Sequence, residues 1–253
     1  MTRASRARFA EIVHSEPVDV GLACLLIGCE VEPDLDIDAS LAQLDDLARR
    51  ARPYVETSGA AAGLRQALAG FQGSPDDYDH VRSSLLHEVL RRRRGLPVLL
   101  SVLWCEIAAR LDIVAVPLGL PGHVMVCLGD PFDEHVVVDP FHGGDPVEVA
   151  AEPVLQPADL LLRVLTNIRA LAARQPRSLD VARTQLWATE LSLLLPHHPL
   201  VLRRERGELL VRLGGFAAGA RQLEEFAALV EDVDPTAAVE TRQHARLARA
   251  QLN

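Results

Sequence analysis

The amino-acid sequence predicts an α+β protein, in which a helical N-terminal region is followed by a small antiparallel sheet and then by a helical tail. Apolar residues recur at helical spacing over residues 5–72 and again from residue 157 onward. Between these regions, two runs rich in β-branched residues flank the turn-forming segment Gly129-Asp130-Pro131. Hydrophobic residues make up 49% of the 253 residues and aromatic residues only 4%, so the core must consist mainly of Leu, Val and Ala.

The N-terminal region reads as several short helices. In the helix expected over residues 41–50, the polar residues 38–40 offer an N-terminal cap, and Pro53 is expected to end the helix. Another helix is expected over residues 60–69, before the glycines at positions 70 and 73.

Two further helices precede the sheet. Residues 74–77 form a loop and capping signal, and residues 83–90 read as a helix that ends in four consecutive arginines, 91–94. Arginines suit the C-terminus of a helix, so this run is either a solvated helix end or a patch for an anion or an acidic partner. Pro97 occupies the position that proline favours in a first helical turn, and it is expected to begin a helix that runs to Leu111.

The sheet is expected to contain a strand at residues 112–117, a hairpin over residues 123–139 and a short edge strand at residues 147–149. A hairpin turn centred on Pro131 would pair His123 directly with Asp139. A carboxylate beside an imidazole fixes the tautomer of the ring and raises its basicity, which is the base-and-orienter half of a catalytic triad.

Four short motifs around this hairpin occur in order: Arg94-Gly-Leu-Pro97, the helix end Ala109-Arg-Leu111, Leu120-Pro-Gly-His123 and Asp139-Pro-Phe-His142-Gly-Gly144. Together they resemble the bacterial transglutaminase-like proteins of the invasion-regulator Sir-B type. The resemblance covers nearly the whole chain and implies a papain-like transglutaminase core followed by a tetratricopeptide-like tail. It also implies that His123 and Asp139 occupy the catalytic His and Asp positions, and that Glu88 matches an acidic residue typical of the family.

The nucleophile of such a triad is missing from the sequence. Active relatives carry a Cys at the start of the helix, where this chain has Pro97, followed by Val98 and Leu99. None of these side chains can attack a carbonyl group. Ser101 and Cys105 lie further along the same helix and are expected to point away from the face that Leu99 presents. Cys105 is also too far from the helix N-terminus for the dipole to stabilise a thiolate. The chain is therefore expected to be a pseudoenzyme rather than an enzyme.

Three residues near the expected cleft are candidates for binding: Glu88, Arg94 and His142. His142 also allows a His-Asp-His set with His123 and Asp139, and two imidazoles with one carboxylate can form a mononuclear metal site. The alternative is that His142 hydrogen-bonds to the backbone of the glycine-rich turn. On the sequence alone, neither a metal nor a cofactor is expected.

The tail is expected to be tetratricopeptide-like. Pro199 and Pro235 each introduce a helix, and their spacing is close to the repeat length of about 34 residues. Small and large residues from Gly207 to Ala220 resemble one repeat, and a final helix over residues 236–252 is expected to act as a cap. The predicted division is therefore a transglutaminase-like domain at 1–156 and a tetratricopeptide-like region at 157–253.

The charge and the cysteine content exclude several classes of function and location. The net charge of −9 argues against general binding to nucleic acid or to anionic membranes. All basic residues are arginines, so no lysine of this chain can donate the amine of an isopeptide cross-link. No apolar segment is long enough to span a bilayer, and the four cysteines follow no zinc or disulfide spacing. These features predict a cytoplasmic protein that does not associate with membranes.

Three functional hypotheses follow from the sequence. The first is a protein-binding or regulatory protein that keeps a transglutaminase-like scaffold without its thiol chemistry and binds its partner through the cleft or the tail. The second is a hydrolase or transferase with an altered mechanism, in which His123 and Asp139 activate water or a substrate. The third is a structural subunit in which the same pair only stabilises the hairpin. The sequence does not indicate an oligomeric state.

Overall fold

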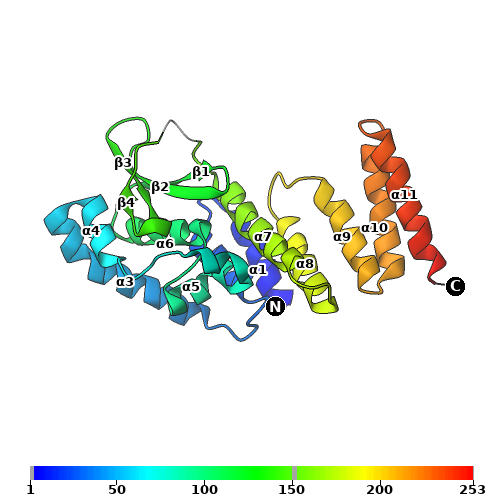
Figure 1. Ribbon diagram of the computed structural model, residues 1–253, viewed down its shortest axis with the longest axis horizontal. Coiled ribbons are helices and arrows are strands. Elements are labelled where there is room, and N and C mark those ends of the chain that lie inside the picture. Colours follow the sequence, from blue (N-terminus) through cyan, green and yellow to red (C-terminus); the bar gives the residue numbers. More distant parts are fainter. Residues whose placement is uncertain (1–2, 150–152, 253) are drawn as a thin grey trace. The chain divides into compact units, whose positions relative to one another are not determined.

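The computed structural model describes residues 3–149 and 153–252, which form two compact units, Met1–Val164 and Leu165–Asn253. None of the described helices is long and apolar enough to cross a membrane. The first unit contains helices and a four-stranded antiparallel sheet, and the second contains only helices (Figure 1). This architecture confirms the predicted fold class.

The first unit begins with helices α1 to α4 and continues through two 3₁₀ helices to α5 and α6. The bounds are α1 Arg3–Val13, α2 Val20–Gly28, α3 Ile37–Ser58, α4 Ala60–Ala67, η1 Pro75–Asp79, η2 Val81–Ser84, α5 Leu86–Arg92 and α6 Pro97–Arg110. Helix α6 is apolar on all sides and is buried from Pro97 to Trp104, as expected for the central helix of a core. It packs against β1 and β2 (Figure 1).

The sheet has the order β1-β2-β3-β4, and every neighbouring pair is antiparallel. Its strands are β1 Ala115–Leu120, β2 His123–Gly129, β3 His135–Asp139 and β4 Asp145–Pro146, and a 3₁₀ helix, η3 Pro140–His142, follows β3. Beyond β1, Leu118 forms an isolated bridge with Val154. The sheet therefore covers one side of α6.

Helix α7, Pro157–Arg174, runs across the division between the two units. The remaining helices are α8 Leu179–Ser192, α9 Val201–Arg212, α10 Phe216–Val230 and α11 Pro235–Ala250. Glycines allow helices α9 and α10 to approach closely. A Cβ at Gly219 would lie only 2.8 Å from the carbonyl oxygen of Gly207. Apolar clusters, including Ala220 with Ala245 and Phe226 with Ala238, then pack α10 against α11.

Several predicted helix bounds are wrong. Pro53 does not end a helix but lies inside α3, which continues to Ser58. The N-cap of α3 is Asp36, whose carboxylate accepts from the Ala39 N–H at 2.9 Å. Helix α5 begins three residues later than predicted, because a 3₁₀ turn occupies residues 81–84.

The predicted hairpin register is also wrong by two residues. Val126 pairs with Val138 and Gly129 with His135, so the turn centres on residue 132 rather than on Pro131. A displacement of two residues keeps every side chain on its predicted face of the sheet. The first strand lies at 115–120 rather than 112–117, and the edge strand lies at 145–146 rather than 147–149.

Candidate functional site

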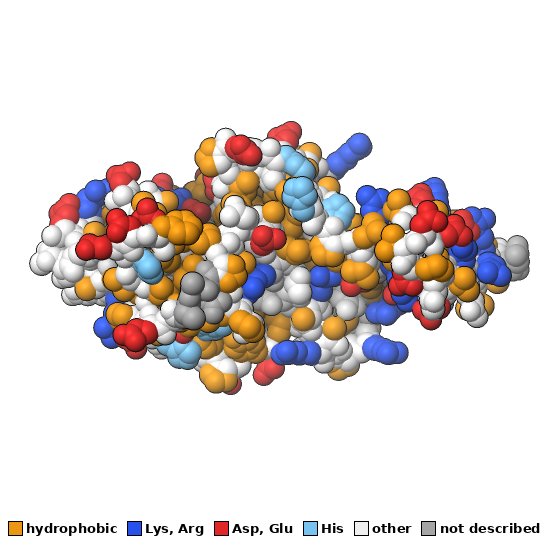
Figure 2. Space-filling model, turned by 90° about the horizontal axis from the view of Figure 1, so that it is seen from above, with side chains coloured by type: hydrophobic (Ala, Val, Ile, Leu, Met, Phe, Trp, Pro, Cys, Tyr) orange, Lys and Arg blue, Asp and Glu red, His pale blue; other side chains and the backbone are white. Residues whose placement is uncertain are grey.

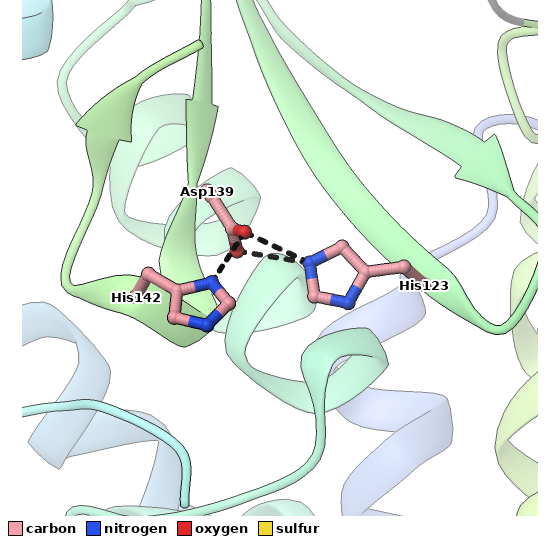
Figure 3. A group of neighbouring side chains, drawn as sticks. All are labelled: His123, Asp139 and His142. Atoms are coloured by element: carbon pink, nitrogen blue, oxygen red, sulfur yellow. Dashed lines mark hydrogen bonds and ion pairs between the residues drawn. The ribbon is translucent and has the colours of Figure 1, made fainter.

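His123 and Asp139 contact each other at one end of the hairpin, as predicted. His123 is the first residue of β2 and Asp139 is the last residue of β3. The Nε2 atom of His123 lies 3.0 Å from each carboxylate oxygen of Asp139 (Figure 3). Because of the shifted register the two residues are diagonal neighbours rather than direct partners. The contact therefore depends on the reach of the imidazole across the end of the ladder.

Asp139 connects the residues of the site through its hydrogen bonds. Its carboxylate also accepts from the backbone N–H of Phe141 at 3.0 Å and lies 2.7 Å from Nδ1 of His142 (Figure 3). Only 5% of the residue is exposed. Burial alone would raise the pKa of Asp139, but the hydrogen bonds from His123 and His142 outweigh burial and lower the pKa to about 2. Asp139 is therefore an anion throughout the physiological pH range.

An aromatic side chain supports this group of residues. The ring centroid of Phe141 lies 5.9 Å from those of Tyr78 and His123 and 5.2 Å from that of His142. Burial and then the charge of Asp139 raise the pKa of Tyr78, so its phenol stays protonated. The backbone carbonyl of Phe141 accepts from the N–H of Gly73 at 3.0 Å, which ties the 3₁₀ turn to the loop before η1.

Arg163 of α7 anchors the strand that carries His123. Its guanidinium donates to the carbonyl oxygens of Leu120 at 2.9 Å and of His123 at 3.1 Å. These two carbonyls flank the β1–β2 turn, so Arg163 fixes the position from which the imidazole projects. The sequence carries no local signal for this contact, because Arg163 is 40 residues from His123.

No nucleophile stands at the start of α6. Pro97, Val98 and Leu99 are all buried. The hydroxyl of Ser101 donates to the carbonyl oxygen of Val124 at 3.0 Å, which satisfies it inside the core. The first turn of α6 is thus built from packing residues.

Cys105 does not replace the missing nucleophile. It lines a separate cavity of about 460 Å³, and the described residues around that cavity include neither His123 nor Asp139. Burial, and then the charge of Glu106, raises the pKa of the Cys105 thiol to about 12. The thiolate is therefore scarce at neutral pH.

The structure brings His123, Asp139 and His142 together but gives Glu88 and Arg94 partners of their own. Glu88 forms an ion pair with Arg91 at 2.8 Å. Arg94 lies 3.4 Å from the carboxylate of Asp77 and hydrogen-bonds to Ser74. Neither contact includes a member of the His-Asp-His group.

Asp77 is an anchor that the sequence analysis did not single out. It is 1% exposed, accepts from the Ser74 backbone and the Ser83 hydroxyl, and pairs with Arg92 and Arg94. The polar residues around Pro75 predicted a capping loop, and Asp77 forms a capping box with Ser74. Its second function, holding the arginine run, depends on tertiary packing.

Within the part of the chain that the structure describes, two groups of side chains present atoms that are able to bind a metal. In the first, the ligand atoms of His123, Asp139 and His142 all lie within 4.8 Å of one another. In the second, the same holds for Glu32, His87 and Glu88.

Sequence comparisons agree with this architecture. Residues 38–152 match the family model of the transglutaminase-like superfamily, and residues 161–253 match a tetratricopeptide repeat. A UPF0162 protein of Xylella fastidiosa strain 9a5c is 30% identical over 83% of each chain, and one of strain Temecula1 is 29% identical over 85% of each. The chain belongs to the UPF0162 family.

A more distant similarity covers part of this UPF0162 chain. Human F-box only protein 21 is 28% identical over 42% of the chain and 20% of its own length. No solved structure matches the chain. The family model and the geometry agree on a transglutaminase-like core and a repeat tail.

Proposed function

We propose that this UPF0162 protein is a non-catalytic, protein-binding regulator of the invasion-regulator Sir-B type. The observation that carries the proposal is the start of α6, where Pro97, Val98 and Leu99 are packed into the core at the place of a nucleophile. A transglutaminase-like unit that lacks a thiolate nucleophile can keep its fold but cannot catalyse acyl transfer through a thioester. In this proposal, residues 1–156 form the scaffold and residues 157–253 form the tail that binds the partner, as the predicted domain boundary divides the chain.

The tail supplies the surface for the partner. A groove of about 350 Å³ within the second unit is lined by Arg169, Gln185, Thr189, Glu208 and Arg212, among others. Both acidic and basic side chains lie on the face of the tail that Figure 2 shows. A groove with both charges and several hydrogen-bonding groups suits an extended polar segment of a protein partner better than an apolar helix or nucleic acid.

The thiols support a cytoplasmic location for this function. All four cysteines are free, and three of them are buried. Unpaired, buried thiols are typical of proteins from a reducing compartment.

The test is affinity capture with the full chain and with a double variant, Glu208→Arg/Arg212→Glu, followed by titration of the captured partner in purified form. Reversing both charges keeps the net charge and changes the groove. We expect the variant to bind the purified partner at least tenfold more weakly. Equal binding by the two proteins would remove the tail groove from the proposal.

Catalysis is tested separately. The full chain is expected to attach no fluorescent amine to a glutamine substrate and to cleave no peptide, and Cys105→Ala should give the same baseline. Thiol-dependent turnover that disappears in Cys105→Ala but persists in Cys127→Ala would overturn the non-catalytic assignment.

One observation favours a second function, a hydrolase with an altered mechanism. Asp139 holds Nε2 of His123, and no described residue hydrogen-bonds to the opposite ring nitrogen, Nδ1. An oriented imidazole with a free nitrogen can act as a general base toward water. Slow ester hydrolysis that is lost in His123→Ala and kept in Cys105→Ala would support this function over the first.

A further inference from the structure

The buried carboxylate of Asp139 lacks the counter-charge that Asp77, the other buried carboxylate among the described residues, has. Asp77, which is equally hidden, lies beside the guanidinium groups of Arg92 and Arg94. Among the described residues, no arginine pairs with Asp139, and the chain contains no lysine. A buried anion requires a compensating positive charge. Around Asp139 that charge must come from the imidazoles or from a bound cation.

The three side chains are arranged as ligands. Nε2 of His123 lies 3.0 Å and Nδ1 of His142 2.7 Å from Asp139 oxygens, and both rings point to the same carboxylate (Figure 3). Ligands bound at about 2.1 Å to one ion are about 3.0–3.4 Å apart in octahedral or tetrahedral geometry. The N–O separation at His123 already lies in this range, and the separation at His142 needs to lengthen by about 0.3–0.7 Å. The side chain of His142 is 67% exposed and has room to turn toward His123.

The surroundings also fit a metal site. The Phe141 N–H donates to Oδ1 of Asp139 and orients the carboxylate from outside, as the partners of metal ligands do. The side chain of His123 is 20% exposed and that of His142 67%, so the site is open to solvent on one side. Three protein ligands with an open side leave positions for water or for a group of a partner.

The second group, Glu32 with His87 and Glu88, lacks this potential. The guanidinium of Arg91 lies 3.1 Å from a carboxylate oxygen of Glu32 and 2.8 Å from one of Glu88. The position of a cation is therefore already taken by a side chain of the protein.

We propose that His123 Nε2, the Asp139 carboxylate and His142 Nδ1 bind one divalent transition-metal ion, with Zn²⁺ as the best fit to two imidazoles and one carboxylate. The sequence alone favoured no metal, because the direction of His142 in its glycine-rich turn was unknown. The metal site goes beyond the proposed protein-binding role and does not depend on it.

The experiment is a calorimetric titration of the chelator-treated full chain with ZnCl₂, with Co²⁺ absorption as a spectroscopic probe of the same site. We expect one ion per chain and a higher melting temperature of the loaded protein. His142→Ala and His123→Ala should each weaken Zn²⁺ binding by at least about 100-fold, since loss of even an orienting partner costs about 10–100-fold. His142 is exposed, so His142→Ala is expected to fold normally without metal.

His135→Ala is the matched control, because His135 is an exposed histidine of the same hairpin whose ring hydrogen-bonds to the Asp133 carbonyl. It should bind Zn²⁺ as the wild type does. The proposal is overturned if the wild type shows no saturable binding, or if His142→Ala and His123→Ala retain wild-type affinity, as they would if thiols bound the ion. The groove variant Glu208→Arg/Arg212→Glu should keep full Zn²⁺ affinity, so failure of the metal site and failure of the partner-binding proposal are separate results.

Discussion

Asp139 and His123 contribute differently to the site, although they form one hydrogen-bonded pair. The Asp139 carboxylate accepts from a buried backbone N–H as well as from two imidazoles. Asp139→Ala should therefore lower the free energy of unfolding by about 1–3 kcal/mol for each buried donor that it strands. His123→Ala removes one partly exposed donor and should cost about 1 kcal/mol or less. Urea unfolding of both variants in the presence of chelator measures the difference.

The same two variants separate a functional site from a structural one. If the pair serves function, His123→Ala should impair partner binding or activity per folded molecule more than it impairs stability. If His123→Ala unfolds as readily as Asp139→Ala and functions like the wild type, the pair only stabilises the hairpin.

The thiols are expected to be unreactive in the folded protein. Burial raises the pKa of Cys24, Cys29 and Cys127, and it raises that of Cys105 to about 12. Since only the thiolate is alkylated, iodoacetamide at pH 7.5 should label the native chain far more slowly than the chain in urea. Mass spectrometry of the two samples checks this, and rapid native labelling of Cys105 would contradict the proposal that the protein is a pseudoenzyme.

At the residue scale, the sequence predicted the partners but not the environment. The contact of His123 with Asp139 could be predicted because two residues on one face of a hairpin stay close even when the register shifts by two. Tyr78, Phe141 and Arg163 could not be assigned to the site, because their contacts with it depend on how distant segments pack. His142 bonds to a carboxylate rather than to the backbone, and this required the geometry of the 3₁₀ turn.

At the scale of elements, the turn after β3 depends on two glycines with different requirements. Both have positive φ, +79° at Gly143 and +81° at Gly144, but a Cβ at Gly144 would lie 2.3 Å from the ring of Trp104. Gly143→Ala should cost about 1–3 kcal/mol through backbone strain alone. Gly144→Ala should cost about 1–3 kcal/mol more, because it also overpacks the core against α6. Chemical denaturation of the two variants isolates the Trp104 contact, and equal losses would show that the ring moves aside freely.

Helix α5 gives the first unit a pH dependence. His87 is 4% exposed, and burial lowers its pKa despite the opposing charges of Glu32 and Glu88. Between the lowered pKa of the folded state and the unfolded pKa of about 6.5, the unfolded chain binds this proton and the folded chain does not. Stability is therefore fully present above pH 6.5 and is lost as the pH falls, by up to about 1.4 kcal/mol per pH unit.

The measurement is the free energy of unfolding of the wild type and of His87→Gln between pH 5 and 7. The free energy of unfolding of the variant should depend less steeply on pH, because the variant lacks the imidazole at position 87 and its other histidines titrate as before. Equal slopes would mean that His87 is protonated in the folded state.

The elements themselves were largely predictable from periodicity, and their ends were not. Pro97 and the apolar run behind it fixed α6 correctly, because proline suits a first helical turn and the run suits a buried helix. The helix end predicted at Pro53 was wrong, since α3 tolerates a proline in its last turns rather than ending there. The hairpin register differed by two residues because a turn several residues long allows more than one pairing.

At the scale of the whole molecule, the first unit needs the beginning of the tail. Leu160, Leu161 and Val164 are 3%, 0% and 1% exposed and belong to the first unit. Each contributes about 1.5–3 kcal/mol by burial, and their combined loss rivals a total stability of about 5–15 kcal/mol. A fragment 1–156 should therefore melt at a clearly lower temperature than a fragment 1–178, which keeps all of α7. Equal melting temperatures would show that these residues stabilise only the tail.

Helix α7 also determines where domains of this family can be recombined, in evolution or in design, without loss of the site. The repeat match begins at residue 161, inside a helix whose first half completes the transglutaminase-like unit. A recombination point at that family boundary would take Arg163 away from the strand that carries His123. The loop at residues 175–177, between α7 and α8, is the better crossover site. A chimera joined there inherits an intact site together with a new set of repeats.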